Sequence, residues 1–167
     1  MLRLIIALVM VGYLNALEIK SISANFTQIV KNESQNIEYK GKLIATVDSK
    51  GYWEYYKPVK KQIIINKDRV LIYERELNQA IVDSKLSIDF LKVINSIKKS
   101  KDNLYESIIN NQKFLVSMKD NKPSKIEYMD DLDNEIVILL SNVKIDEKID
   151  ESIFDLKLPE DADIITN

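Results

Sequence analysis

Two groups of acidic residues are the first candidates for chemistry in this chain. One comprises Asp130, Asp131 and Asp133, and the other runs from Asp146 to Glu151. Paired carboxylates can divide general-acid and general-base roles, but only where an apolar environment separates their pKa values. Both groups lie in polar sequence that is typical of turns, so we expect solvated surface. The first also lacks the glycine and the spaced terminal glutamate of a calcium-binding loop.

The chain contains no histidine and no cysteine. The commonest general base, the commonest metal ligand, the thiol nucleophile and the disulfide are therefore all missing. No G-x-S-x-G motif and no phosphate-binding glycine loop is present. We predict a protein that is not an enzyme and holds neither metal nor cofactor. A small exported hydrolase is the alternative from another class.

Composition indicates one globular domain. The 167 residues are 46% hydrophobic and 30% charged, with a formal net charge of -2. This length allows one sizeable core, and the charge is not that of a disordered chain. Because no strongly basic patch is present, we expect no nucleic-acid partner.

Residues 1–16 are typical of a secretory signal peptide. Arg3 precedes an apolar run from Leu4 to Tyr13, and Ala16 provides a small residue for cleavage. The run is short against the roughly 20 residues that a spanning helix needs. We therefore predict export and a single mature domain over residues 17–167. Because no cysteine follows the run, this mature chain would carry no lipid of its own.

Hydrophobic periodicity predicts an α+β fold with a large antiparallel sheet. Apolar residues at spacings of three and four predict helices over residues 17–30 and 86–97, with Ser87 and Asp89 as candidate caps of the second. Period-two alternation predicts a strand over 37–47, a four-stranded meander over 51–82, and strands over 105–109, 113–118, 125–129 and 135–141. We expect a helical turn over 150–154, and turns made mostly by Asn, Asp and Ser.

The meander is apolar on both faces. Trp53 and Tyr55 alternate with Tyr52 and Tyr56, whereas a sheet with one wet face alternates between apolar and polar residues. Something else must therefore cover its second face. A sheet of about eight strands also tends to curl, and two or three helices cannot fill a wide curl. The remainder would be an apolar cavity, and such cavities bind apolar ligands.

The sequence SISANFTQ at 21–28 follows the pattern S-x-x-A-x-F-x-Q, and Gly41 to Leu43 with residues 51–58 is similar to G-x-L followed by F-x-W-x-Y-x-x-P. In these segments the chain resembles the LolA family of periplasmic outer-membrane lipoprotein carriers. Residues 68–82 and 158–165 resemble two further family segments. The match follows the order of nearly the whole mature chain, and the signal peptide agrees with it.

The resemblance implies an open, incomplete antiparallel β-barrel with an α-helical lid over a hydrophobic cavity. It implies a periplasmic carrier, acting as a monomer, that takes acylated lipoproteins from an inner-membrane ATP-driven transporter to an outer-membrane acceptor. Carried over by position, the cavity would be lined by Leu43, Ala45, Val47, Trp53, Tyr55, Ile64, Leu71 and Tyr73. The lid would carry Phe26, Ile29, Leu91 and Ile94.

One position departs from the family pattern. Better-known members have an arginine six residues before the tryptophan, where it ties the sheet to the lid, and this chain has Val47. Lys50 is nearby but has the opposite strand parity, so we expect lid opening to work differently here.

Other proteins of the same fold remain alternatives. A lipid-anchored acceptor is disfavoured because no cysteine follows the signal peptide, and a sensor would carry a second domain. A purely structural interaction protein would bind no lipid.

Overall fold

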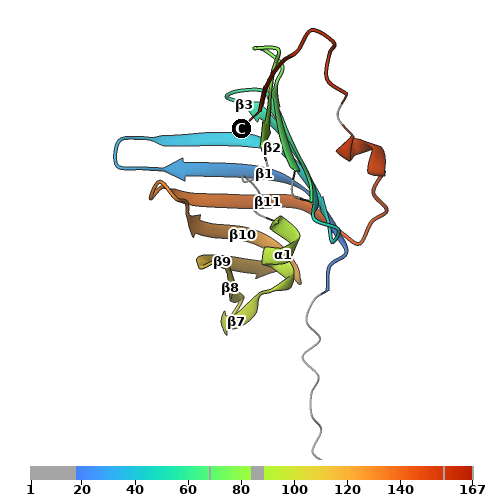
Figure 1. Cartoon of the computed structure of the whole chain (residues 1–167). Coiled ribbons are helices and arrows are strands. Elements are labelled where there is room, and N and C mark those ends of the chain that lie inside the picture. Colours follow the sequence, from blue (N-terminus) through green and yellow to red (C-terminus); the bar gives the residue numbers. More distant parts are fainter. Residues whose placement is uncertain (1–17, 68, 84–88, 156, 167) are drawn as a thin grey trace, which may run out of the picture.

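The computed structural model describes residues 18–67, 69–83, 89–155 and 157–166. They form one curled, open sheet of twelve strands in the order β12-β6-β5-β4-β3-β2-β1-β11-β10-β9-β8-β7 (Figure 1). The strands are β1 (Ser21–Lys31), β2 (Asn36–Thr46), β3 (Lys50–Lys57), β4 (Lys61–Asn66), β5 (Arg69–Glu74), β6 (Gln79–Asp83), β7 (Lys98–Lys101), β8 (Leu104–Ile109), β9 (Gln112–Lys119), β10 (Lys122–Met129), β11 (Glu135–Ile145) and β12 (Asp163–Thr166). The predicted signal peptide lies outside the described residues.

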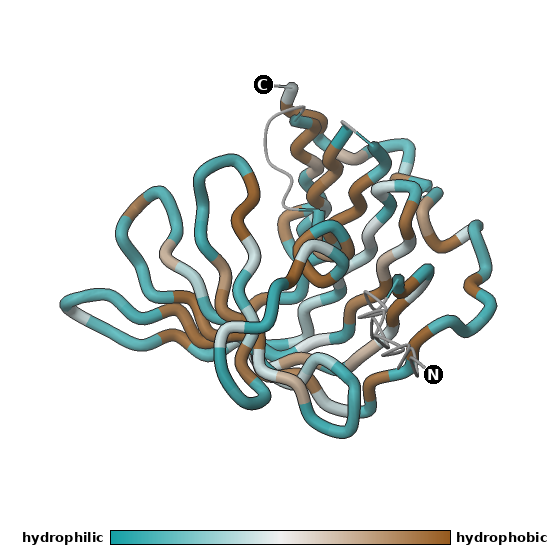
Figure 2. The backbone as a smooth tube through the Cα atoms, turned by 90° about the horizontal axis from the view of Figure 1, so that it is seen from below, coloured by the Kyte–Doolittle hydropathy of each residue, from teal (hydrophilic) through white to brown (hydrophobic). Residues whose placement is uncertain are grey.

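One α-helix accompanies this sheet within the described residues. It is α1 (Phe90–Asn95), and the short 3-10 turn η1 (Glu151–Phe154) follows β11. We call the face that α1 covers the concave face and the opposite one the convex face (Figures 1 and 2). The fold is thus mostly β, with less helix than the sequence predicted.

β1 joins the two halves of the sheet. It pairs with β2 on one side and with β11, more than 100 residues later, on the other. The strand pairs are antiparallel except that β12 lies parallel to β6. The four-stranded meander is confirmed as β3 to β6, and the later strands are confirmed as β8 to β11. The predicted helical turn is confirmed as η1.

The predicted helix over residues 17–30 is wrong, because Ser21–Lys31 is strand β1. Ile22, Phe26 and Val30 fit a helical stripe, but with Ala24 they also alternate with period two. Ser, Asn, Thr and the β-branched Ile and Val of this segment are poor helix formers. Two long apolar neighbours satisfy its backbone groups on both sides, so the pairing decides the outcome.

The predicted helix over residues 86–97 is confirmed only in part. α1 begins after Asp89, whose Oδ1 accepts a hydrogen bond of 2.9 Å from Lys92 N, as predicted for a cap. Residues 84–88 lie outside the described part. After Ser96 the chain becomes β7 rather than more helix, because Lys98 and Lys99 pair with β8.

Turns follow the expected chemistry. Positive φ angles occur at Ser49, Lys67, Asn78, Asn103, Asn110, Asn111, Asp120, Asn121, Asp133, Asn142 and Asp146. With one exception these residues are Asn, Asp or Ser, which tolerate the left-handed region best after glycine. Figure 2 shows the result, with hydrophilic turns at the ends of hydrophobic strands.

The meander is covered on both faces. Trp53 and Tyr55 belong to the large cluster under α1, whereas Tyr52 and Ile64 pack on the convex face against Phe154 of η1. The chain after β11 therefore supplies the second cover that the doubly apolar sequence predicted.

Candidate functional site

The concave face carries a continuous apolar cluster closed by α1. Phe90, Leu91, Val93 and Ile94 of the helix are all buried in it. Its other buried members are Ile19, Ile22, Ala24, Phe26, Leu43, Ala45, Tyr55, Phe114, Val116, Ile126, Ile136 and Ile138. One amphipathic helix thus covers side chains from both halves of the sheet.

Aromatic rings form the centre of this cluster. The Phe26 ring lies 5.1 Å from Trp53 and 5.0 Å from Tyr55, both edge-on, and Trp53 lies 5.5 Å from Phe90 of α1. Gly41 makes the stack possible, since a Cβ there would lie 2.7 Å from Phe26 Cζ and 2.0 Å from the Glu54 carbonyl oxygen. Glycine is needed here for close approach.

A small apolar cavity remains between α1 and the sheet. Its volume is about 50 Å³, and its lining residues are Trp53, Phe90, Val93, Phe114, Ile126, Tyr128 and Ile138. Pockets that hold organic ligands usually measure about 300–1,000 Å³. In this closed arrangement the helix fills the space that a larger apolar ligand would need.

Hydrogen bonds hold both ends of α1. At its start, Ser49 Oγ donates to Asp89 Oδ2 at 2.7 Å. At its end, Asn95 Nδ2 donates to the Ile19 carbonyl at 2.8 Å, and Ile19 N donates to Asn95 Oδ1 at 3.0 Å. Val47, at the position of the family arginine, is 49% exposed. A hydroxyl–carboxylate hydrogen bond at Ser49 and a pair of amide hydrogen bonds at Asn95 therefore tie the helix to the rest of the fold.

The eight predicted cavity residues do not all lie together. Leu43, Ala45, Trp53 and Tyr55 share the cluster under α1. Ile64 and Leu71 instead pair with each other in the convex cluster with Phe154, which corrects their assignment to the Trp53 face. Strand pairing explains this, because Ile64 lies opposite Tyr52 rather than Trp53.

The remaining two predicted cavity residues are also placed away from α1. Tyr73 alternates in step with Leu71, and its hydroxyl donates to Asn78 Oδ1 at 3.1 Å. Val47 follows the end of β2, and its side chain is exposed.

The four predicted lid residues separate in the same way. Leu91 and Ile94 lie on α1 and are fully buried on the concave face. Phe26 and Ile29 lie on β1 and not on a helix, and only Phe26 belongs to the concave cluster.

Sequence reasoning missed the part of the lining that comes from the second half of the sheet. Phe114, Ile126 and Ile138 lie on β9, β10 and β11, and all three line the cavity. Period-two alternation within each strand, such as Phe114 with Val116, could have found them once β1 was recognised as the link between the halves.

A more polar group of side chains lies beside the aromatic stack. Tyr55 donates from its hydroxyl to Gln28 Oε1 at 2.9 Å. Lys61 Nζ lies 4.7 Å from the Tyr55 ring centre and 5.7 Å from that of Tyr39. Burial lowers the pKa of Lys61 and raises the pKa of Tyr55, while burial raises the pKa of Tyr128 to about 12. Tyr55 and Tyr128 therefore keep their phenolic protons at neutral pH, and Tyr55 does so beside the partly desolvated ammonium of Lys61.

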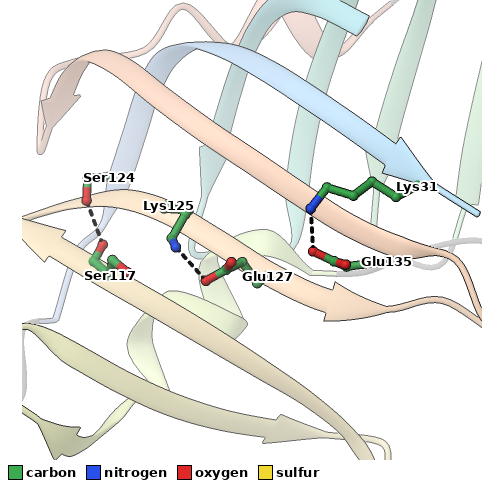
Figure 3. Close-up of polar contacts among 6 residues, drawn as sticks. All are labelled: Lys31, Ser117, Ser124, Lys125, Glu127 and Glu135. Carbon is green, nitrogen blue, oxygen red and sulfur yellow. Dashed lines mark hydrogen bonds and ion pairs between the residues drawn. The ribbon is translucent and has the colours of Figure 1, made fainter. Parts of the chain in front are cut away.

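The convex face of the second half is polar. Lys31 pairs with Glu135 at 2.7 Å and Lys125 with Glu127 at 2.8 Å, and Ser124 Oγ donates to the Ser117 carbonyl at 3.0 Å (Figure 3). Exposed ion pairs of this kind contribute little stability. They mark a solvated surface and leave the concave face as the apolar one.

The acidic groups have structural contacts. Asp130 Oδ1 accepts from the amides of Leu132 and Asn134 at 2.9 Å, and Asp146 Oδ1 accepts from Lys20 N at 2.7 Å. The described residues contain no group of three side chains able to hold a metal ion. No helix among them has the length and hydrophobicity to cross a bilayer.

Comparisons with known proteins agree with this geometry. Residues 18–157 match the family model described as outer membrane lipoprotein carrier protein LolA. Proteins named outer-membrane lipoprotein carrier protein are 36% identical in Helicobacter pylori strain J99, over 81% of this chain and 74% of theirs, and 33% identical in Campylobacter jejuni, over 96% of both. An uncharacterized conserved protein from Thermus thermophilus is 12% identical, with a TM-score of 0.56 over 91% of this chain and 93% of that one, which shows a common fold.

Proposed function

This chain belongs to the LolA family of outer membrane lipoprotein carrier proteins, and on that premise we propose that it binds the acyl chains of lipoproteins on its concave face and carries them to the outer membrane. The observation that carries the proposal is the apolar cluster of the concave face, which spans both halves of the sheet and is closed by one six-residue helix. The carrier performs no chemistry.

We propose that α1 acts as the lid of an incomplete β-barrel. The cavity of about 50 Å³ is too small for an acyl chain, so binding requires α1 to move outward. Among the residues that the structure describes, two side-chain contacts with the sheet region fix the ends of the helix by hydrogen bonds, that of Ser49 with Asp89 and that of Asn95 with Ile19. Such a helix can leave without breaking a strand pair.

The energies of lid and cargo are of similar size. Burying the four apolar side chains of α1 is worth about 1.5–3 kcal/mol each, or about 6–12 kcal/mol together. A sixteen-carbon acyl chain gains about 0.8 kcal/mol per buried methylene, or roughly 12 kcal/mol. One chain therefore roughly balances the lid, and two or three chains drive it open. A nearly balanced exchange suits a protein that must also release its cargo.

The proposed route follows from the family. Residues 1–16 direct export to the periplasm, and residues 17–167 form one carrier domain that acts as a monomer. An inner-membrane ATP-driven transporter supplies the acylated lipoprotein, and an outer-membrane acceptor receives it.

A charge in the stack tests the concave face as the binding site. Trp53→Glu places a carboxylate among apolar groups, so we expect a folded protein whose affinity for a triacylated peptide falls at least tenfold. Titration of the peptide, followed by calorimetry, measures this, and Leu139→Glu on the exposed convex face of β11 is the matched control. Undiminished binding by the Trp53 variant would remove the concave face from the proposal.

A further inference from the structure

Lys61 is a charged residue beside two aromatic rings, and Glu74 on the neighbouring strand acts on it by charge without forming an ion pair. It begins β4, opposite Tyr55 on β3 and Glu74 on β5. Its ammonium lies over the faces of Tyr55 and Tyr39, and it forms no ion pair with any residue that the structure describes. The neighbouring Lys60, by contrast, is exposed and lies 4.0 Å from Glu76.

This position has an energetic cost. A lysine usually lays its stem on apolar surface and keeps its ammonium in water. Here burial lowers the pKa of Lys61, so part of its hydration has been lost. Two cation–π contacts stabilise the ammonium by about 0.5–2 kcal/mol each. The N–H groups of Lys61 still lack an oxygen acceptor among the described residues.

The surroundings of Lys61 provide further polar groups at the edge of the apolar cluster. Gln28 accepts the hydroxyl of Tyr55, and the ring of Tyr39 lies 5.8 Å from that of Tyr55. Trp53, which lines the cavity under α1, is two residues from Tyr55 along β3, or roughly 7 Å at the usual rise of a strand. A ligand with an apolar chain and an oxygen-bearing end fits this change from apolar to polar lining.

We propose that Lys61, with Tyr39, Tyr55 and Gln28, binds the carbonyl oxygen at the polar end of an acylated ligand whose hydrocarbon chain lies under α1. The inference rests on the proposed function and adds to it the group that fixes the direction of the chain. A lipid-modified peptide presents the oxygen of an ester or amide carbonyl and a free fatty acid that of a carboxylate, and both are acceptors for the ammonium.

Lys61→Met tests this site because it keeps the length of the stem and removes the charge. Trp53 is the single tryptophan of the chain, so its fluorescence reports ligand at the stack. A triacylated peptide supplies acyl carbonyls, palmitate supplies a carboxylate, and hexadecanol has the same chain length as palmitate without either group. Lys60→Met is the matched control, and Lys61→Arg restores a charged donor.

The expected result is selective. Lys61→Met should lower the affinity for palmitate and for the triacylated peptide about tenfold, as expected for the loss of one charge-assisted hydrogen bond. The affinity for hexadecanol should fall less than threefold. If the affinity falls for palmitate alone, the site binds a carboxylate. If the affinity falls for both ligands, the site binds the acyl carbonyl. Equal affinities in Lys61→Met and the unaltered protein, or an equal loss for hexadecanol, would overturn the inference. If the unaltered protein fails to bind the triacylated peptide, the proposed function itself fails.

Discussion

Phe26 lies at the centre of the aromatic stack on the concave face. Its ring touches Trp53 and Tyr55, and the gap left by Gly41 allows it to lie close to the sheet. The register of β2 and β3 shifts between Lys40 and Gly41, which places the glycine against the Glu54 carbonyl. One missing Cβ therefore sets the position of the aromatic stack.

Gly41→Ala should destabilise the fold. Its Cβ would meet backbone at 2.0 Å, and the Glu54 carbonyl cannot move without disturbing β3. We expect a loss of about 2–3 kcal/mol or more in the free energy of unfolding, measured with urea.

Gly51→Ala is the control for this change. Its Cβ would lie 3.3 Å from Ile65 Cδ1, the end of a flexible side chain, so the loss should stay below about 1 kcal/mol. Equal losses at both glycines would show that Gly41 has no special role in the stack.

At the scale of elements, α1 is the part of the concave cluster that is joined to the sheet by few hydrogen bonds. Asn95 is its main polar contact, because one amide side chain satisfies both the N–H and the carbonyl of Ile19. Losing this pair leaves two backbone groups without partners, at about 1–3 kcal/mol each. The end of the helix should then detach more often.

Asn95→Ala should accelerate hydrogen exchange at the amides of α1 by at least tenfold, while exchange in β1 and β2 changes less. Mass spectrometry of proteolytic fragments measures both regions. Lys92→Ala, on the exposed side of the same helix, serves as control. Unchanged exchange in Asn95→Ala would show that the Asn95 hydrogen bonds do not hold α1 against the sheet.

Individual elements differ in how far the sequence could predict them. The meander and the Asp89 cap rest on local patterns, and both were confirmed. β1 was mistaken for a helix because Ile22, Phe26 and Val30 suit both periods, and its partners β2 and β11 cannot be seen within a local window. β7 and β12 are four residues long and exposed throughout, so no alternation of buried and exposed residues reveals them.

The same reasoning applies to the site. Leu43, Ala45, Trp53 and Tyr55 could be placed together because they lie on adjacent strands of one hairpin. Ile64 and Leu71 could not, since a strand that is apolar on both faces gives no sign of which face a residue takes. The lining residues on β9, β10 and β11 could be placed only by knowing that β1 joins the two halves of the sheet.

At the scale of the whole molecule, one sheet has two apolar surfaces that are covered by different elements. The convex cluster around Tyr52 and Ile64 is covered by η1, which lies between β11 and β12 in the sequence. The concave cluster is covered by a helix with six residues, and it extends over both halves of the sheet. The concave surface is therefore the one that we propose exchanges its cover for acyl chains.

Release of lipoprotein from the inner membrane tests this account most directly. Spheroplasts containing a labelled, outer-membrane-directed lipoprotein are incubated with purified protein comprising residues 17–167, with the Trp53→Glu variant, or with buffer. We expect labelled lipoprotein in the soluble fraction, in complex with the protein, only with the unaltered sequence. Equal release with all three additions, or none with the unaltered sequence, would contradict the carrier function.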